Sequence, residues 1–339
     1  MSRRARGVLG AVVTLALLWW VLRDVSPAEV MAELRGASPW WLATSVLLAT
    51  FSFVLRAARW RVLLEPGHIG SPFEARFGAT CTGFAANNLF PARLGELIRA
   101  YVLSRVAAVP FGASVGSLVV ERVLDGLVLA IFLVVPIVLP GFPLGDAEAA
   151  SRIHRVALVA SIVFALGFVI LGIAARRQAD SYRLWSRTLG RLVPERLAER
   201  VDGLVETFLN GLGALGRIGV LARAVAWSFV VWTCLAASIW AALLAFDVTA
   251  PGPLGAAFLQ AVIAFAVAAP STPGFFGVFE AAARVGLQPW DVPDATIVSV
   301  ATSYHILTFI PVTLIGLWYV RRVGLRWTEM RRRPVEEAG

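Results

Sequence analysis

Long apolar segments alternate with short polar segments along nearly the whole chain. Six of the apolar segments approach or reach the roughly 20 residues that a helix needs to cross a bilayer. Uninterrupted apolar stretches of this length are typical of transmembrane helices. The pattern therefore predicts an all-α, polytopic helical membrane protein with about six full spans, at residues 7–22, 38–55, 115–139, 156–174, 221–246 and 295–320.

Two further apolar segments are each broken in the middle by polar residues. The first contains the stretch NNLFPARLGELIRA at residues 87–100, and the second contains PSTPGFFG at residues 270–277. The parts on either side of each break are too short to span a membrane comfortably. We therefore expect two re-entrant helical hairpins, with Pro91 and Pro273 at the start of the second half-helix, a position that suits proline.

The two broken segments resemble each other in spacing and in context. Each carries the pattern P-x-x-x-G at its break, and each lies between two predicted spans. If every span crosses the membrane, the two hairpins have opposite orientations. Paired broken segments in corresponding positions are the sequence sign of an inverted repeat. The predicted units cover about residues 39–140 and 221–320.

The charged residues bear on topology and on partners. All 31 basic residues are arginine, and the formal net charge is +9. Predicted cytoplasmic segments hold 21 of the arginines and predicted outer loops hold 5, which places both termini in the cytoplasm. Arginines beside membrane spans favour anionic lipid rather than nucleic acid as a partner. Residues 1–339 then form a single integral membrane domain, with an amphipathic cytoplasmic segment at 176–217 and a cytoplasmic tail at 321–339.

Ionisable side chains within membrane segments are costly and are therefore candidates for function. The breaks also direct helix N-termini, which attract anions, toward the membrane interior. Arg93 and Arg99 are the leading candidates, because a guanidinium binds phosphate with two hydrogen bonds and keeps its charge. The full set of candidate binding residues is Arg59, Asn87, Asn88, Arg93, Glu96, Arg99, Glu121, Arg122, Asp125, Ser271, Thr272, Glu280 and Tyr304, and the structural breaks are Pro91, Gly95, Pro273 and Gly277.

Structural roles remain open for several of these residues and for His305, a further polar candidate of the second unit. An arginine at the end of a span can extend to the interface and set topology, and a carboxylate can simply balance a neighbouring arginine. The alternatives concern Arg59 as an interface residue, Glu121, Arg122 and Asp125 as an ion-pair network, Glu96 as a partner of Arg93 or Arg99, Asn87 and Asn88 as helix caps, and His305 as a packing residue.

Motifs for catalysis or cofactor binding are absent from the sequence. The chain has no glycine-rich nucleotide loop, no HExxH pattern and no nucleophile elbow. Its three histidines and two cysteines have no metal-site spacing. We therefore predict no cofactor, no metal and no enzymatic activity.

Several stretches together resemble one known family. NNLFPARLGELIRAYVLSR, VVERVLDGLVL, PSTPGFFGVFEAA and SYHILTFIPVTLIGLWYV are similar to the lysylphosphatidylglycerol synthase transmembrane region, a flippase-like superfamily of bacteria and archaea. The resemblance covers about residues 7–322. It implies a multi-pass protein of the cytoplasmic membrane that moves phospholipids or polyisoprenoid-phosphate-linked molecules between leaflets. We expect no counterpart here of the soluble aminoacyl-transferase domain of the fused synthases. The residues that match the family motifs are Asn88, Pro91, Arg93, Gly95, Glu96, Arg99, Glu121, Arg122, Asp125, Pro273 and Gly277.

The leading hypothesis is a flippase or transporter for an anionic phospholipid or a polyisoprenoid-phosphate-linked lipid. One alternative is a membrane-embedded transferase that acts on a lipid-linked substrate, with Glu96, Glu121 or Asp125 as general base. Another is a non-transporting membrane scaffold. A homodimer is a further open alternative.

Overall fold

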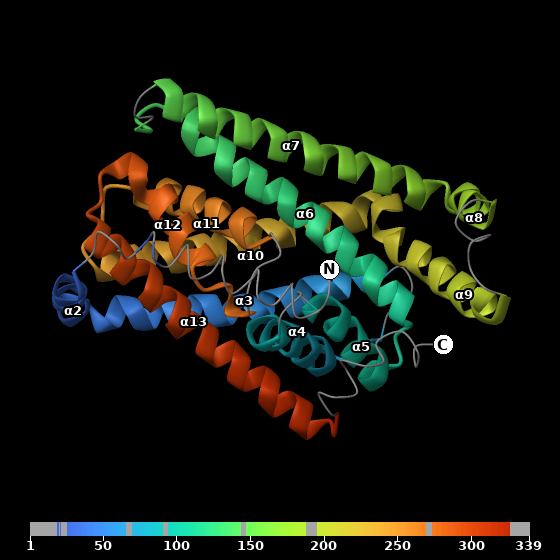
Figure 1. The fold of residues 1–339 in the computed structure, drawn as a ribbon. Helices are drawn as coiled ribbons and strands as arrows, with labels where there is room; N and C mark the ends of the chain where they lie inside the picture. Colours follow the sequence, from blue (N-terminus) through green and yellow to red (C-terminus); the bar gives the residue numbers. More distant parts are fainter. Residues whose placement is uncertain are drawn as a thin grey trace.

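Helices are the only regular elements in the described part of the chain. The computed structural model describes residues 19, 21, 26–65, 70–90, 94–143, 147–187, 195–268 and 273–325. Within these ranges the all-α prediction is confirmed (Figure 1). The elements are α2 (Pro27–Gly36), α3 (Pro39–Leu64), α4 (Phe73–Leu89), α5 (Gly95–Ala107), α6 (Phe111–Val138), α7 (Ala147–Arg176), α8 (Gln178–Arg187), α9 (Glu195–Gly211), η2 (Leu212–Gly216), α10 (Ile218–Ala245), α11 (Gly252–Ala268), η3 (Pro273–Phe275), α12 (Val278–Leu287), η4 (Gln288–Trp290) and α13 (Asp294–Arg322).

Three of the described helices, α3, α10 and α13, are long and apolar enough to cross a membrane. The end of α7 and the helix α8 meet at a bend of 98° and together would make a fourth span. Helix α6 has 28 residues, but three charged side chains lie near its middle. The first predicted span lies almost entirely outside the described residues. The structure therefore has three or four clear spans where the sequence predicts six.

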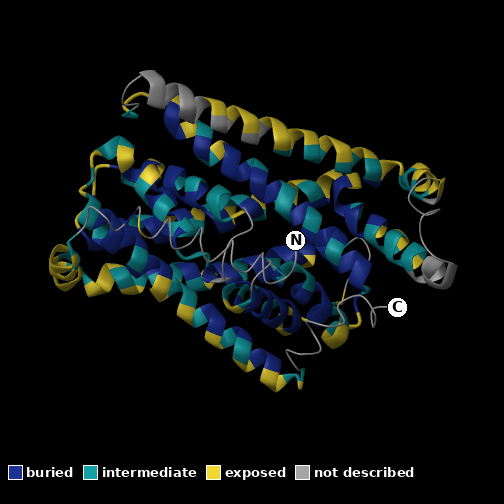
Figure 2. Ribbon diagram, viewed as in Figure 1, coloured by how far each residue is buried: buried dark blue, intermediate teal, exposed yellow. Residues whose placement is uncertain are grey.

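Helix α7 exposes large apolar side chains between Leu158 and Ile173 (Figure 2). A soluble protein rarely exposes a continuous apolar surface of this kind, whereas a bilayer solvates it favourably. The exposed residues are Leu158, Val159, Ile162, Val163, Leu166, Val169, Ile170 and Ile173.

Both broken segments form helical hairpins. Helices α4 and α5 pack antiparallel, and Gly83 and Gly95 lie where their backbones approach most closely. Helices α11 and α12 pack on each other in the same way. Helix α4 extends to Leu89, so Asn87 and Asn88 lie in its last turn rather than in the break.

The prediction that Pro273 begins the second half-helix is wrong. Pro273 opens the short 3₁₀ turn η3, and α12 begins only at Val278. Gly274 has φ 70° and Gly277 has φ 83°, a left-handed backbone that interrupts a right-handed helix. The helix therefore starts after the second of these glycines. Pro91 lies outside the described residues.

Helices of the first predicted unit pack against helices of the second. Helix α3 packs along α10, where Ser45 Oγ donates to Ser238 O at 2.8 Å and Ser238 Oγ donates to Ser45 O at 2.7 Å. Small residues allow such close contact between membrane helices. Helix α4 of the first hairpin packs on α13, and α11 of the second hairpin packs on α6.

The arginine-rich segment 176–217 contains the helices α8 and α9, as the sequence predicts for one or two helices. Helix α9 packs against the first half of α6, where Gly112 and Gly116 leave room for the α9 backbone at Leu204 and Phe208. Figure 1 shows α8 at the end of α7, while α9 runs back beside α6.

We predict that Gly83→Ala lowers the free energy of unfolding by about 1–3 kcal/mol, because overpacking a close contact forces the structure to shift. An added Cβ would lie 2.6 Å from Gly95 O and 2.8 Å from Arg99 Cβ. The matched control is Gly172→Ala on α7, whose added Cβ meets nothing within 4 Å. That change should be neutral or stabilising by up to about 1 kcal/mol. Unfolding in detergent, followed by tryptophan fluorescence, measures both, and equal effects would contradict the packing assigned to α4 and α5.

Candidate functional site

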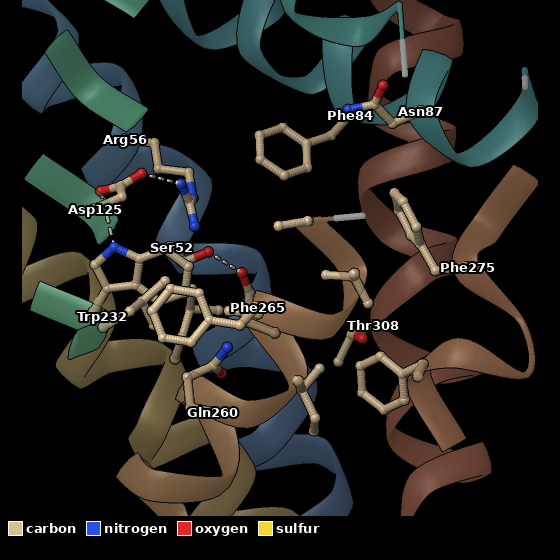
Figure 3. A pocket seen from close by; sticks show the side chains of 18 of the residues that line it. Ser52, Arg56, Phe84, Asn87, Asp125, Trp232, Gln260, Phe265, Phe275 and Thr308 are labelled. Atoms are coloured by element: carbon tan, nitrogen blue, oxygen red, sulfur yellow. Dashed lines mark hydrogen bonds and ion pairs between the residues drawn. The ribbon is translucent and has the colours of Figure 1, made fainter. Parts of the chain in front are cut away.

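A cavity of about 420 Å³ lies at the centre of the helical assembly (Figure 3). Both hairpins and the long helices α3, α6, α10 and α13 contribute to its wall. Hydrophobic side chains dominate the lining. The polar and charged lining residues are Ser52, Arg56, Asn87, Asn88, Glu96, Arg122, Asp125, Gln260, Tyr304, His305 and Thr308.

Two carboxylates on α6 form the centre of an ion network beside the cavity. Glu121 and Asp125 are one helical turn apart, so both point from the same face of α6. Glu121 is fully buried and Asp125 is 2% exposed. Carboxylates this far from solvent require cationic partners.

Arg59 on α3 joins both carboxylates. Its Nη2 lies 3.1 Å from Glu121 Oε1, and its Nη1 donates to Asp125 Oδ1 and, at 2.9 Å, to Ser228 Oγ on α10. The side chain is fully buried. The alternative in which Arg59 extends to the membrane interface is therefore wrong, and Arg59 instead connects α3, α6 and α10.

Arg99 and Arg122 complete the shell around Glu121. Each places a guanidinium nitrogen 2.7 Å from Glu121 Oε1, and Arg122 also lies 3.0 Å from Asp125 Oδ2. Arg99 stacks over the ring of Trp60 at 4.0 Å, a favourable cation–π contact. Arg99 thus pairs with Glu121 of α6, not with Glu96 of its own helix. Glu96 is half-buried and lines the cavity.

Arg56 extends from α3 into the cavity between two aromatic rings, those of Phe84 at 5.3 Å and Trp232 at 5.1 Å. Its Nη1 lies 3.8 Å from Asp125 Oδ2, which is too long for a hydrogen bond. Asp125 Oδ1 instead accepts from Trp232 Nε1 at 2.8 Å, as Figure 3 shows. Arg56 is only 4% exposed, yet its Nε and Nη1 have no hydrogen-bond partner within the described ranges.

The network contains more positive than negative charge. Arg56, Arg59, Arg99 and Arg122 surround two carboxylates, and Arg99 Nε and Nη2 also have no partner among the described residues. Buried donors without acceptors are unfavourable, and a buried guanidinium favours an anion with several acceptor oxygens. The arrangement is therefore suited to hold a phosphate or carboxylate group.

A second polar cluster lies at the break of the second hairpin. Glu280 Oε2 accepts from the backbone N–H of Gly277 at 2.6 Å, and Glu280 Oε1 lies 2.8 Å from His305 Nδ1. Tyr304 lines the cavity beside His305, and its hydroxyl lies 3.3 Å from Ser238 Oγ. At this break the Glu280 carboxylate lies next to the N-terminus of α12. The sequence predicts a bound anion at this position.

The asparagines at the first break have structural partners. Asn87 Oδ1 accepts from the backbone N–H of Gly95 at 2.8 Å, and Asn88 Nδ2 donates to Thr313 Oγ1 at 2.8 Å. Both asparagines also line the cavity. Asn87 therefore fixes the start of α5, and Asn88 links α4 to α13.

Four candidates, Pro91, Arg93, Ser271 and Thr272, lie outside the described residues. The other candidates fall into two groups. The residues of the first unit gather around Glu121 and at the first break, while Glu280, Tyr304 and Gly277 gather at the second.

Arg56, Trp232 and Gln260 are absent from the sequence-based candidates, yet all three line the cavity, as does the candidate His305. Arg56 precedes Arg59 by three residues on the same helix, and this spacing could have indicated that both point toward one face. No local sequence pattern marks Trp232 or Gln260 as a cavity residue, because their position in the cavity wall depends on packing between distant segments.

The comparison with known proteins identifies the family. Residues 7–316 match the family described as the lysylphosphatidylglycerol synthase TM region. The chain belongs to this family. It is accordingly a helical membrane protein, and the resemblance noted in the sequence is confirmed.

Two relatives illustrate the range of the family. The chain is 28% identical over 316 residues to "Glycosyltransferase AglD" of Haloferax volcanii, which covers 84% of this chain and 49% of AglD. It thus spans about half the length of AglD. It is 27% identical over 241 residues to a UPF0104 membrane protein of Methanothermobacter thermautotrophicus, covering 67% of this chain and 69% of the relative.

We predict that Asp125→Ala lowers the free energy of unfolding by about 3–5 kcal/mol, because it leaves buried arginines without a counter-charge. The control is Glu65→Ala, which removes a more exposed pair with Arg223 at 2.8 Å. That change should cost at most about 1 kcal/mol. Titration of unfolding with sodium dodecyl sulfate in mixed micelles measures the difference. If Asp125→Ala were as stable as the control, the network would not contribute to the fold as described.

Proposed function

We propose that the protein is a lipid flippase or transporter that moves an anionic phospholipid or a polyisoprenoid-phosphate-linked lipid between membrane leaflets. The observation that carries this proposal is the buried excess of arginine beside the central cavity. Arg56 lines this cavity, and its Nε and Nη1 are buried beside it without a hydrogen-bond partner among the described residues. The family and its membrane-protein relatives support a lipid-related role.

The cavity suits an amphipathic cargo. Arg56 and Arg122 would contact the phosphate at the polar end, with Asn87 and Glu96 beside it. The apolar remainder of the lining, including Phe265 and Phe275, would hold the first carbons of an acyl or prenyl chain. Arg59 would orient Glu121 and Asp125, which in turn hold Arg99 and Arg122 in place.

The proposed architecture is an inverted repeat of two units, about residues 39–140 and 221–320. The first hairpin packs through α4 on the last helix of the second unit, α13, and the second hairpin packs through α11 on the last helix of the first unit, α6. This reciprocal packing supports the inverted repeat, because an approximate two-fold axis would produce it. The two hairpins then enter from opposite sides of the membrane, and six full spans place both termini in the cytoplasm. Transport would follow from movement of one unit against the other.

A membrane-embedded transferase is the second candidate. The observation that favours it is the similarity to AglD, which is named a glycosyltransferase. The cavity-facing carboxylates Glu96 and Asp125 would be its candidate bases. Asp125, however, accepts hydrogen bonds from Arg59 and Trp232, which makes it a poor proton acceptor.

Translocation in proteoliposomes tests the transport proposal. A fluorescent phosphatidylglycerol and a fluorescent phosphatidylcholine are compared, with a quencher that reaches only the outer leaflet. Wild type should move the anionic lipid. Arg56→Gln should reduce the rate of that movement at least about tenfold, because the variant loses one charge-assisted hydrogen bond to the phosphate. Arg223→Gln, which removes an arginine of the Glu65 pair, is the matched control and should retain the wild-type rate.

Folding of each variant is checked by its unfolding curve before transport is measured. Equal transport by wild type and Arg56→Gln would contradict the cavity as the head-group site. Chemical conversion of a lipid-linked substrate without relocation would favour the transferase.

A further inference from the structure

The pair formed by Glu280 and His305 has a fixed geometry. Glu280 is 3% exposed, and each of its carboxylate oxygens has a partner, one on Gly277 N–H and one on His305 Nδ1. A carboxylate bound to Nδ1 fixes the proton of a neutral imidazole on that nitrogen. The other ring nitrogen, Nε2, then carries a lone pair when the ring is neutral and an N–H when it is protonated.

The imidazole is held between aromatic rings at the cavity wall. Phe279 lies 4.4 Å from it with an interplanar angle of 21°, and Phe276 lies 4.6 Å from it at 31°. Aromatic rings this close to the imidazole favour its cationic form. His305 lines the cavity, and its Nε2 has no hydrogen-bond partner among the described residues. The free nitrogen is therefore available to a ligand in the cavity.

The two buried carboxylates of the ion network, Glu121 and Asp125, are less suited to carry a proton. Glu121 lies within ion-pair distance of Arg59, Arg99 and Arg122, and Asp125 has a similar shell. Protonation of either would leave several buried arginines without a counter-charge. Histidine, in contrast, is the side chain whose ordinary pKa lies between pH 5 and 8.

We propose that His305, positioned by Glu280, is a protonatable ligand for the anionic head group and couples lipid binding to proton binding. This inference rests on the proposed function. With a protonated ring, Nε2–H donates to a phosphate oxygen. With a neutral ring, the Nε2 lone pair faces that oxygen and repels it. A proton would therefore enter the cavity with the anion and leave with it.

The charged and titratable groups around His305 are compatible with this role. On α12 the facing group is Glu280, and on α13 it is the neighbouring Tyr304. Helix α10 contributes Ser238 to Tyr304, and α11 contributes the neutral Gln260 to the cavity. Across the cavity, α3 contributes Arg56, α5 contributes Glu96, and α6 contributes Arg122 and Asp125, while α4 contributes only the neutral asparagines.

Binding of dioctanoyl phosphatidylglycerol to the full chain in detergent tests the proposal. This phosphodiester keeps a single negative charge between pH 5.5 and 8.0, so the probe itself does not titrate. Wild type should bind it about tenfold more tightly at pH 5.5, the effect of one added charge-assisted hydrogen bond. His305→Gln should show less than about a twofold difference between the two pH values.

A spectroscopic measurement on the native residue accompanies the binding data. The sequence has three histidines, so the variant His68→Gln/His154→Gln carries His305 alone. This variant should keep the pH dependence of binding. At pH 7.0 the addition of the probe should convert imidazole nitrogen signals in NMR spectra from the neutral form toward the protonated form, and Glu280→Gln should weaken that conversion.

The outcomes separate the two proposals. Failure of wild type to bind or translocate any anionic lipid at either pH would overturn the proposed function itself. Binding with the same affinity at both pH values, or imidazole signals unchanged by the probe, would overturn the proton-coupling role and leave the transport proposal intact. Retention of the full pH dependence by His305→Gln would also overturn it.

Discussion

The pairing of two buried carboxylates with four arginines is the interaction on which the rest of the structure depends. Glu121 and Asp125 bring α3, α5 and α6 together through Arg59, Arg99 and Arg122, and Trp232 adds α10. A buried charge without a partner is unfavourable, so these helices hold their positions as a set. The arginines exceed the carboxylates in number. The same network that organises the helices therefore leaves positive charge beside the cavity, where Arg56 forms part of the wall.

Each of the two hairpins places polar side chains in the wall of the cavity. At the first break, Asn87 fixes the start of α5, and at the second break Glu280 fixes the region before α12 and holds His305. Irregular backbone inside a membrane protein is stable only where protein or a water-filled cavity satisfies its polar groups. In this chain a side chain near each break accepts a hydrogen bond from a backbone N–H group of that break. Asn87, Asn88 and Glu96 of the polar sequence NNLFPARLGELIRA thus line the cavity.

The sequence predicted the elements better than the site. Apolar runs located α3, α6, α7, α10 and α13, and the polar breaks located both hairpins, because these features are local. The partners of Asp125 are 66 and 107 residues away in sequence, on helices whose contact depends on tertiary packing. Arg56 and Arg59 look like interface arginines at the end of a span, and only packing shows that both are buried. His305 looked like a packing residue for the same reason, since its carboxylate partner comes from another helix.

Native mass spectrometry tests most directly whether the arginine excess holds an anion. The protein is released from mixed micelles that contain equal amounts of phosphatidylglycerol and phosphatidylcholine, and the lipid that stays bound to each chain is identified. The account predicts one tightly bound phosphatidylglycerol per wild-type chain, lost in Arg56→Gln and kept in Arg223→Gln. Equal retention of the two lipids by wild type, or the same phosphatidylglycerol retention in Arg56→Gln, would contradict it.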